Sequence, residues 1–594
     1  MPNFHLPTFE RLNATVPTDV DVEQVAATWM RSFSQHAEEG NALAVTALFT
    51  QDSYWRDMLA LTWNFRTFHG SASIAKFLAD RLLPASLANF RVQDSALQPL
   101  GPDLAWIRIS FDFAVKGVGN ASGIVRLVPQ SDGVWRAWGM YTNLEGLEGF
   151  LERIGALRPE FAPGSHAESR NAADNESPVV VIVGGGHSGL ALAARLKSLE
   201  VRTLVVEKNA RIGDNWRNRY DALRLHDPVW YDHMPYLPFP STWPIYTPAK
   251  KLANWLETYA DALDLDVWTS STVLAAQPSS SSGNWKVVIN RDGAERVFSN
   301  VHHVVFATGW GGGQLNVPSF PGMDTFKGEM LHSAEYKRSE RYKEKKVVVI
   351  GACVSAHDVA ADCYSQGIDV TMYQRTSTYV MSTRHGLSAL MKPSYWEGGP
   401  PTEEADRDGA SLAPRAVVEM YRRLTGAVAE ADRELLDGLR GCGFRVNMGI
   451  EGTGSGLLPF ERGGGYYLDV GASELLISGK IKLKNDSQIS GFTERGVRFE
   501  DGSEVEADVV VFATGFGDAR NTIRKVCGDT VGDRCARVWG LDEEGEVNGA
   551  WRGMGVRGLW YMMGNLAMSR FYSKHVALQI KAMEEGIFGE RYGA

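Results

Sequence analysis

The hexapeptide Gly184–Gly189 has the glycine spacing of a dinucleotide-binding turn. It reads G-G-G-H-S-G, follows the β-branched run Val179–Val183 and precedes a predicted helix over Leu190–Leu199. Glycines let the backbone approach a pyrophosphate, and the helix N-terminus supplies N–H donors. The next predicted strand ends at Glu207, 23 residues after Gly184, where an acid accepts from a ribose hydroxyl. This context predicts a dinucleotide site with cofactor contacts from Gly184, Gly186, Ser188, Gly189, Glu207 and Lys208. The alternative is an ordinary glycine-rich turn between a strand and a helix.

A second strand–turn–helix begins near Val347, with the sequence VVVIGACVSAHDVAADCYSQG. It keeps the first glycine, Gly351, but Cys353 and Ala356 replace the other two. The following predicted strand, DVTMYQR, ends at Arg375, 24 residues past Gly351. An arginine there suits the 2′-phosphate of NADPH, although a solvated strand-end charge is the alternative. We predict a second nucleotide site that includes Gly351, Ser355 and Arg375 and that prefers NADPH to NADH.

Two apolar strands end in the same tripeptide, Ala-Thr-Gly. One ends at Gly309 and the other at Gly515. A glycine lacks the Cβ that would clash where a chain segment crosses close to a cofactor. The pair predicts two nucleotide domains joined by crossing segments, with Gly309 and Gly515 beside the cofactors.

The elements that must position these residues have different characters along the chain. From residue 178 onward, buried strands alternate with helices, which predicts doubly wound parallel sheets and an α/β fold class. Residues 386–450 form a polar, mostly helical insertion, and residues 157–177 form a polar linker. The first 156 residues predict a small α+β unit, with helices over Val22–Ala37 and Ala42–Phe49 and strands over Ile107–Val115, Gly123–Val128 and Gly133–Tyr141.

Composition excludes several functional classes. The 594 residues are 44% hydrophobic and carry a net charge of −10, which argues against a disordered chain and a dedicated nucleic-acid binder. No apolar run is long enough to cross a membrane, and the first 20 residues do not resemble a secretory signal. The five cysteines form no C-x-x-C pair, which disfavours a disulfide framework and a metal site. We expect a cytoplasmic protein with a small-molecule substrate.

Between the two glycine motifs lies the pattern F-x-G-x-x-x-H-x-x-x-Y, formed by Phe326, Gly328, His332 and Tyr336. This pattern resembles the fingerprint of flavin-containing monooxygenases (class B flavoprotein monooxygenases), including the plant indole-pyruvate type. The segment GDNWRNRYDALRLHDPVWYDHMPYLPFP and the last predicted helix, GLWYMMGNLAMSRFYSKHVALQIKAM, resemble the same family. The resemblance covers about residues 178–594.

The resemblance implies two Rossmann-like domains that bind FAD and NADPH. It also implies that O2 supplies one oxygen atom to a small hydrophobic substrate through a hydroperoxyflavin. His226, Asn565 and Arg217 are the catalytic candidates beside the flavin, and Asn215 and Trp216 are cofactor contacts. His332 couples NADPH binding to domain geometry in this interpretation, with general-base catalysis as the alternative. Tyr336 stands where Baeyer–Villiger members carry Trp, which disfavours ester formation.

The N-terminal unit resembles SnoaL-like domains, through its helix pair followed by SYWRDMLALTW. It predicts either a homodimer contact or a cyclase in which Asp57 and His69 form an acid–base pair. Trp29, Trp55 and Trp63 are predicted to be core. A flavin-dependent reductase or oxidase without oxygen transfer is a further alternative, disfavoured because no cysteine pair follows the first nucleotide helix.

These features predict a chain of three folded parts. We expect an N-terminal domain over 1–156 and a linker over 157–177. An FAD-binding domain over 178–325 is closed by 513–594, and an NADPH-binding domain over 326–512 contains the insertion 386–450.

Overall fold

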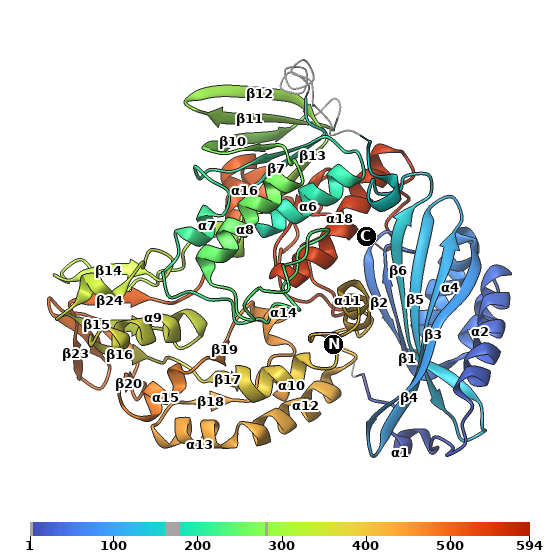
Figure 1. Cartoon of the computed structure of the whole chain (residues 1–594), viewed down its shortest axis with the longest axis horizontal. Helices are drawn as coiled ribbons and strands as arrows, with labels where there is room; N and C mark the ends of the chain where they lie inside the picture. Colours follow the sequence, from blue (N-terminus) through green and yellow to red (C-terminus); the bar gives the residue numbers. More distant parts are fainter. Residues whose placement is uncertain (1–3, 161–176, 280–282, 594) are drawn as a thin grey trace.

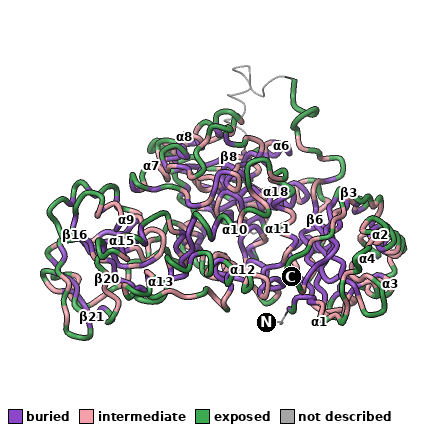
Figure 2. Tube along the Cα trace, turned by 60° about the horizontal axis from the view of Figure 1, so that its bottom comes forward, coloured by how far each residue is buried: buried purple, intermediate pink, exposed green. Residues whose placement is uncertain are grey.

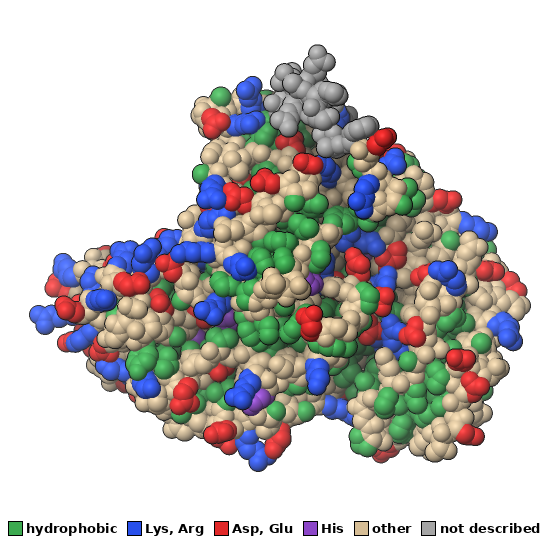
Figure 3. Space-filling model, in the orientation of Figure 1, with side chains coloured by type: hydrophobic (Ala, Val, Ile, Leu, Met, Phe, Trp, Pro, Cys, Tyr) green, Lys and Arg blue, Asp and Glu red, His purple; other side chains and the backbone are tan. Residues whose placement is uncertain are grey.

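The computed structural model describes residues 4–160, 177–279 and 283–593. Three parts, each built around a larger sheet, lie side by side (Figure 1). The predicted linker falls largely outside the described residues. Within the described part of the chain, none of the helices combines the length and apolarity that a membrane crossing requires. On the face shown in Figure 3, acidic and basic side chains are interspersed over all three parts.

The N-terminal part has one six-stranded sheet in the order β2-β1-β6-β5-β4-β3. The helices α2 and α4 pack against it on one side (Figure 1). Its strands are β1 (Phe49–Met58), β2 (Phe65–His69), β3 (Leu87–Gly101), β4 (Leu104–Val115), β5 (Gly119–Pro129) and β6 (Trp135–Leu147). Its helices are α1 (Phe9–Leu12), α2 (Val22–Glu38), α3 (Ala42–Thr46) and α4 (Ser71–Ala85).

The helix α2 forms where the sequence predicts it. Asp21 caps its first turn by accepting a hydrogen bond from the backbone N–H of Gln24 at 2.9 Å. Its buried residues recur at helical spacing: Ala26, Trp29, Met30, Phe33 and Ala37. The second helix, α3, is shorter than predicted, because Phe49 already begins β1.

Aromatic side chains fill the space between α2, α4 and the sheet. Trp29 stacks on Phe33, with ring centroids 5.1 Å apart, and Phe49 stacks on Trp55 at 5.5 Å. Trp63 is also buried, so all three predicted core tryptophans are confirmed. The Asp57–His69 pair is not formed. His69 contacts Asp52 at 2.7 Å, and Asp57 instead accepts hydrogen bonds from Thr62 and Thr142, which fix the turn between β1 and β2.

The part that begins at β7 has a five-stranded parallel sheet in the order β25-β13-β7-β8-β9. The helices α6 and α18 pack against each other beside it. The strands are β7 (Val180–Val183), β8 (Thr203–Val206), β9 (Val267–Trp268), β13 (His303–Phe306) and β25 (Leu559–Tyr561). The helices are α6 (His187–Ser198), α7 (Asp214–Arg217), α8 (Ala249–Ala262), α16 (Arg520–Cys527), α17 (Asp529–Arg534) and α18 (Leu566–Glu584). The small antiparallel sheet is β10 (Ser271–Pro278), β11 (Trp285–Arg291) and β12 (Ala294–Val301).

A second five-stranded parallel sheet has the order β14-β24-β15-β16-β20. Its strands are β14 (Glu329–His332), β15 (Lys346–Ile350), β16 (Asp369–Tyr373), β20 (Lys482–Lys484) and β24 (Val509–Phe512). Two small sheets flank it: β17 (Thr378–Ser382), β18 (Val446–Asn447) and β19 (Tyr466–Asp469), and β21 (Ile489–Phe492), β22 (Gly496–Phe499) and β23 (Glu504–Glu506). The helices are α9 (Val354–Ser365), α10 (Ser388–Met391), α11 (Thr402–Ala410), α12 (Val418–Ala431), α13 (Arg433–Gly441), α14 (Leu458–Arg462) and α15 (Ala472–Ile477).

The predicted insertion covers the second face of the N-terminal sheet. Arg108 contacts Asp408 at 2.6 Å, and the Tyr54 hydroxyl donates to the Ser411 carbonyl at 3.0 Å. Ala413 and Ala416 join one apolar cluster with residues of β1, β4, β5 and β6. The insertion therefore covers this sheet face over β1, β4, β5 and β6, while most of the edge strand β3 is exposed. The homodimer contact through the N-terminal part stays a prediction.

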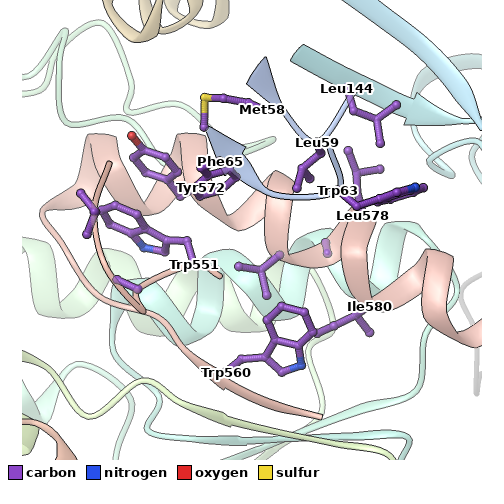
Figure 4. Close-up of a cluster of buried hydrophobic side chains, with 14 of the residues drawn as sticks. Met58, Leu59, Trp63, Phe65, Leu144, Trp551, Trp560, Tyr572, Leu578 and Ile580 are labelled. Carbon is purple, nitrogen blue, oxygen red and sulfur yellow. The ribbon is translucent and has the colours of Figure 1, made fainter. Parts of the chain in front are cut away.

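The N-terminal part is fastened to the rest by a buried ion pair. Arg56 donates to both carboxylate oxygens of Glu546 at 2.7 Å, and their side chains are only 4% and 1% exposed. Next to it, Met58, Phe65 and Leu144 of the N-terminal part pack with side chains of α18 and its neighbours (Figure 4). Buried stretches of α18 and β6 lie next to each other (Figure 2). The two parts thus share one core.

A segment after α18 returns to the N-terminal part. Phe588 packs on Trp63 with ring centroids 4.7 Å apart, and Arg591 donates to the Trp63 carbonyl at 2.7 Å. The Tyr592 backbone N–H donates to the Thr62 carbonyl at 2.9 Å. We call residues 587–593 the C-terminal strap.

Acid is expected to loosen this interface. Burial alone would raise the pKa of Glu546, but Arg56 outweighs it and the pKa is lowered. Lys574 and Arg407 likewise outweigh burial at Glu145, whose pKa is lowered, and Arg11 outweighs it at Glu419, whose pKa is lowered to about 2. A carboxylate whose pKa is lower in the folded state stabilises the fold above its unfolded value, near 4.5, and loses that contribution as the pH falls. Melting temperature should therefore drop steeply below about pH 4.5, and less steeply in E145Q. An equal slope in E145Q contradicts this expectation.

Candidate active site

The first glycine motif joins β7 to α6 in a tight turn, in which two of the glycines have no space for a side chain. Gly184 has a φ of +113°, and a Cβ there would lie 2.5 Å from the Ala307 carbonyl oxygen. A Cβ on Gly189 would lie 2.1 Å from the Gly184 carbonyl oxygen. A Cβ on Gly186 would meet only the Asn215 amide, at 3.3 Å. A side chain would therefore clash with the backbone at Gly184 and Gly189, whereas at Gly186 there is space toward Asn215 of α7.

Glu207 follows β8 and faces this turn. One of its oxygens accepts from the Gly185 backbone N–H at 2.8 Å and the other from the Asn209 backbone N–H at 2.8 Å. The side chain is buried, and Lys208 beside it is exposed. The structure therefore brings Glu207 to the glycine turn, as an acid for a ribose hydroxyl requires.

The N-termini of α6 and α18 converge at this turn. His187 donates from Nε2 to the Gly564 carbonyl at 2.9 Å, and the Ser188 and Ser569 hydroxyls lie 2.8 Å apart. Asn565 caps α18, because its side-chain oxygen accepts from the Met568 N–H at 2.9 Å. Two helix N-termini place partial positive charge at one point, which suits a phosphate or an anionic ring.

The loop after α7 runs between the two parallel sheets. The Asp227 carboxylate accepts from the Asn565 side chain at 3.3 Å, at the start of α18. His226 Nε2 lies 3.5 Å from the Asp358 carboxylate on α9. Burial favours the neutral imidazole, but Asp358 outweighs it and the pKa of His226 is raised. Two neighbouring residues therefore connect the first sheet's α18 with the second sheet's α9.

Several buried polar atoms around this loop have no hydrogen-bond partner in the described part of the chain. They belong to five side chains and are His187 Nδ1, Trp216 Nε1, Arg219 Nε, His226 Nδ1 and both Asp232 oxygens. Burial raises the pKa of Asp232 well above its usual range. Unpaired buried polar atoms are costly, so their concentration here indicates partners from a bound molecule. The residues present fit a large polar cofactor such as FAD.

Arg217 does not join this group. Its guanidinium contacts Asp214 at 3.0 Å and Glu257 of α8 at 2.8 Å. It also donates to the Ile212 carbonyl at 2.7 Å. All of these partners lie on the α7–α8 side, so the donors of Arg217 hold α7 against α8. Its expected place beside the flavin stays a prediction. Trp216, next to it, packs near His187 with ring centroids 6.2 Å apart.

The second glycine motif opens into a cavity of about 990 Å³. Gly351, Ser355, Arg375 and Gly515 all line it. The cavity also reaches Trp310, which follows β13 of the first sheet, and Met563, which follows β25. It therefore runs from the second sheet to the end of the first. Such a shape fits a dinucleotide whose phosphates lie at α9 and whose other end approaches the first sheet.

The Phe326–Tyr336 motif supports the join between the sheets. Phe326 is buried in a cluster with Val510 and Phe512 of β24, and a Cβ on Gly328 would lie 2.4 Å from the Asp508 carbonyl oxygen. His332 accepts from the Ala334 N–H at Nδ1 and donates from Nε2 to the Gly515 carbonyl at 3.0 Å. Burial lowers the pKa of His332. With both nitrogens engaged, this ring is placed as a structural connector.

The two Ala-Thr-Gly segments end strands of different sheets, β13 and β24. The chain after each one pairs with the other: Leu315 bridges Phe516, and the Asn316 N–H donates to the Gly515 carbonyl at 3.1 Å. Gly309 accepts from the Tyr561 hydroxyl at 3.0 Å. The two sheets are therefore joined directly beside the cavity.

Sequence reasoning missed the carboxylates of α9. Asp358 accepts from the Tyr220 hydroxyl at 2.7 Å, and Asp362 accepts from the Tyr336 hydroxyl at 2.6 Å. Their spacing of four residues puts them on one face of the helix. The signal was present in the segment HDVAAD, but nothing in the sequence indicated which loops this face would meet. A second cavity, of about 1,180 Å³, is lined by His226, Asp358 and Asp362 among others.

Comparisons with known proteins agree with this geometry. Residues 178–388 match a family model described as flavin-binding monooxygenase-like. The chain is 32% identical to indole-3-pyruvate monooxygenase YUCCA1 of Oryza sativa subsp. japonica over 344 residues, 57% of this chain and 77% of that protein. It is 30% identical to the probable indole-3-pyruvate monooxygenase YUCCA3 of Arabidopsis thaliana over 350 residues, 57% and 72% of the two chains. An ε-caprolactone-bound cyclohexanone monooxygenase has a similar fold, with a TM-score of 0.50 and 19% identity over 69% of this chain and 88% of that one.

Proposed function

Because the chain belongs to the flavin-binding monooxygenase-like family, we propose that it uses NADPH and O2 to add one oxygen atom to a small organic molecule. FAD occupies the site formed by the first glycine turn, Glu207 and the N-termini of α6 and α18 in this proposal. NADPH occupies the cavity at the second glycine motif. The observation that carries the proposal is the group of buried polar atoms, from His187 to Asp232, that have no hydrogen-bond partner among the described residues around the start of α6 and the loop after α7.

When bound, FAD would accept electrons from NADPH and activate O2. The chain's own residues bind and orient. The α6 N-terminus and Gly186 receive the pyrophosphate, and Glu207 receives the ribose. Asn565 holds the start of α18, whose N–H groups stabilise negative charge on the flavin ring. His226 would present Nδ1, which has no hydrogen-bond partner among the described residues, as a hydrogen-bonding group toward that ring.

Water exclusion is the second task of the site, since water would discharge activated oxygen as hydrogen peroxide. His226 is 9% exposed, and Asp232 is 1% exposed. The stacked rings of His357 and Tyr467, with centroids 3.7 Å apart, lie behind His226. The second cavity offers space for the organic substrate next to His226, and we assign the substrate to it.

Reduction by NADPH tests the proposal. Anaerobic NADPH should bleach the flavin of the wild-type protein, and O2 should then restore it. In R375A, the KM for NADPH should rise about 10- to 100-fold, because a charged hydrogen bond to a phosphate is worth about 1.5–3 kcal/mol. The KM for NADH, which lacks the 2′-phosphate, is the internal control and should stay within about twofold.

Each outcome of this experiment is informative. Arg375 is exposed and lines the cavity, so its loss should leave the fold intact. Failure of NADPH to bleach the wild-type flavin contradicts the assignment of the second nucleotide site. Bleaching with an equal rise in both KM values in R375A contradicts the role of Arg375. If a broad substrate screen yields hydrogen peroxide and no oxygenated product, the protein is an oxidase.

A further inference from the structure

One helix touches both the nucleotide cavity and the residues beside the flavin site. The N-terminal turn of α9, with Val354 and Ser355, lines the cavity of about 990 Å³. One turn further along, Asp358 faces the second cavity. Because α9 is a continuous helix of 12 residues, a displacement or fixation of its first turn is transmitted to Asp358.

Asp358 holds two residues of the loop between the sheets. Its Oδ2 accepts from the Tyr220 hydroxyl at 2.7 Å, and its Oδ1 lies 3.5 Å from His226 Nε2. The Asp358 side chain is 10% exposed and that of His226 is 8% exposed, so solvent competes little for this contact. In the described part of the chain, His226 Nδ1 has no hydrogen-bond partner, so Asp358 restrains the ring through Nε2 while Tyr467 packs against it with ring centroids 6.3 Å apart.

We propose that Asp358 is a positioning residue that makes the orientation of the His226 ring depend on occupancy of the nucleotide cavity. The inference rests on the proposed function, because it takes that cavity as the NADPH site. A phosphate held by the N–H groups at the start of α9 fixes the helix, and Asp358 then fixes His226. Nucleotide binding thereby strengthens the hold of Asp358 on the His226 ring.

Asp362 provides a matched control on the same helix face. It accepts from the Tyr336 hydroxyl at 2.6 Å and from the Ser339 N–H at 3.1 Å, and these belong to a different segment from His226. D358N and D362N both replace a carboxylate by an amide of the same size. Only D358N removes the charge that faces His226.

The test follows the His226 ring directly in FAD-loaded protein labelled with 13C- and 15N-histidine. The ring signal is assigned by its absence in H226Q. Adding NADP+, which binds without reducing the flavin, should shift this signal in the wild type and in D362N, and leave it in place in D358N. If D358N does not fold, Y220F removes the other anchor of the Asp358 carboxylate and should weaken the shift.

Binding measurements complete the test, because coupling between two sites is reciprocal. D358N and H226Q should each change the Kd for NADP+ about fivefold or more, and D358N should have no further effect in the H226Q background. An unchanged shift in D358N, or additive effects in the double variant, overturns the inference while the proposed function stands. If NADP+ does not bind the wild type at all, the proposed function itself fails.

Discussion

R56M is expected to lower the free energy of unfolding by about 3–5 kcal/mol. Arg56 is the cation that neutralises Glu546, and both side chains are almost fully buried between the N-terminal part and the rest of the chain. Removing the guanidinium leaves a buried carboxylate without its charge partner. Thr67 still donates to it at 2.7 Å, which is far from sufficient compensation. Urea unfolding at neutral pH, followed by tryptophan fluorescence, measures the change.

R91M is the matched control for this substitution. Arg91 belongs to β3 of the same sheet and pairs with Asp112 at 3.4 Å, but the two side chains are 75% and 47% exposed. Its loss should cost less than about 1 kcal/mol. The double variant R56M/E546M, with no buried charge left, should recover most of the stability. Similar losses in R56M and R91M would show that the buried pair does not fasten the interface.

G184A is expected to weaken FAD binding at least a hundredfold, which corresponds to about 2.7 kcal/mol. Gly184 has a φ of +113°, which an L-residue rarely adopts, and the new Cβ would lie 2.5 Å from the Ala307 carbonyl oxygen. Because that oxygen belongs to the backbone after β13, the turn itself has to shift. The backbone N–H groups at the start of α6 then leave the position that receives a pyrophosphate. Titration of the apoprotein with FAD, followed by flavin fluorescence, gives the Kd.

G367A separates backbone strain from the clash. Gly367 also has a positive φ, +72°, but a Cβ there meets no atom within 4 Å. G367A should lose about 1 kcal/mol of stability and keep the wild-type Kd for FAD. If G184A binds FAD as tightly as G367A, the first glycine turn is not the pyrophosphate site.

The nucleotide-binding elements were predictable because their signals are local. A strand, a glycine turn and a helix lie within 22 residues at Val180–Val201, where the hydrophobic run and the glycines are visible in the sequence, and Glu207 follows six residues later. The structure confirms these elements with small shifts of their ends. The second motif was equally legible at Gly351, even though Cys353 and Ala356 replace its other glycines. Which cofactor each site binds is assigned by the proposal and not by the fold.

The contacts between distant segments were not predictable. The insertion was expected to lie outside the core, yet Ala413 and Ala416 are buried against the N-terminal sheet. Arg56 and Glu546 are 490 residues apart, and no periodicity links their positions. The same limit applies to the ion pair of Arg217 with Glu257, because Glu257 lies on a helix whose orientation follows from packing. Side-chain partners across a fold depend on how whole elements dock, which a pattern within one segment does not encode.

The C-terminal strap has a consequence for synthesis on the ribosome. Tyr592 contacts a turn that follows β1, and the last strand of the N-terminal sheet, β6, ends at Leu147. At about 5–20 residues per second, roughly 20–90 s separate the emergence of these two positions. During that interval the nascent sheet carries Tyr54, Arg56 and Trp106 on a face that its later partners have not yet covered. This interval gives chaperones that bind exposed apolar surface time to act on the uncovered sheet face.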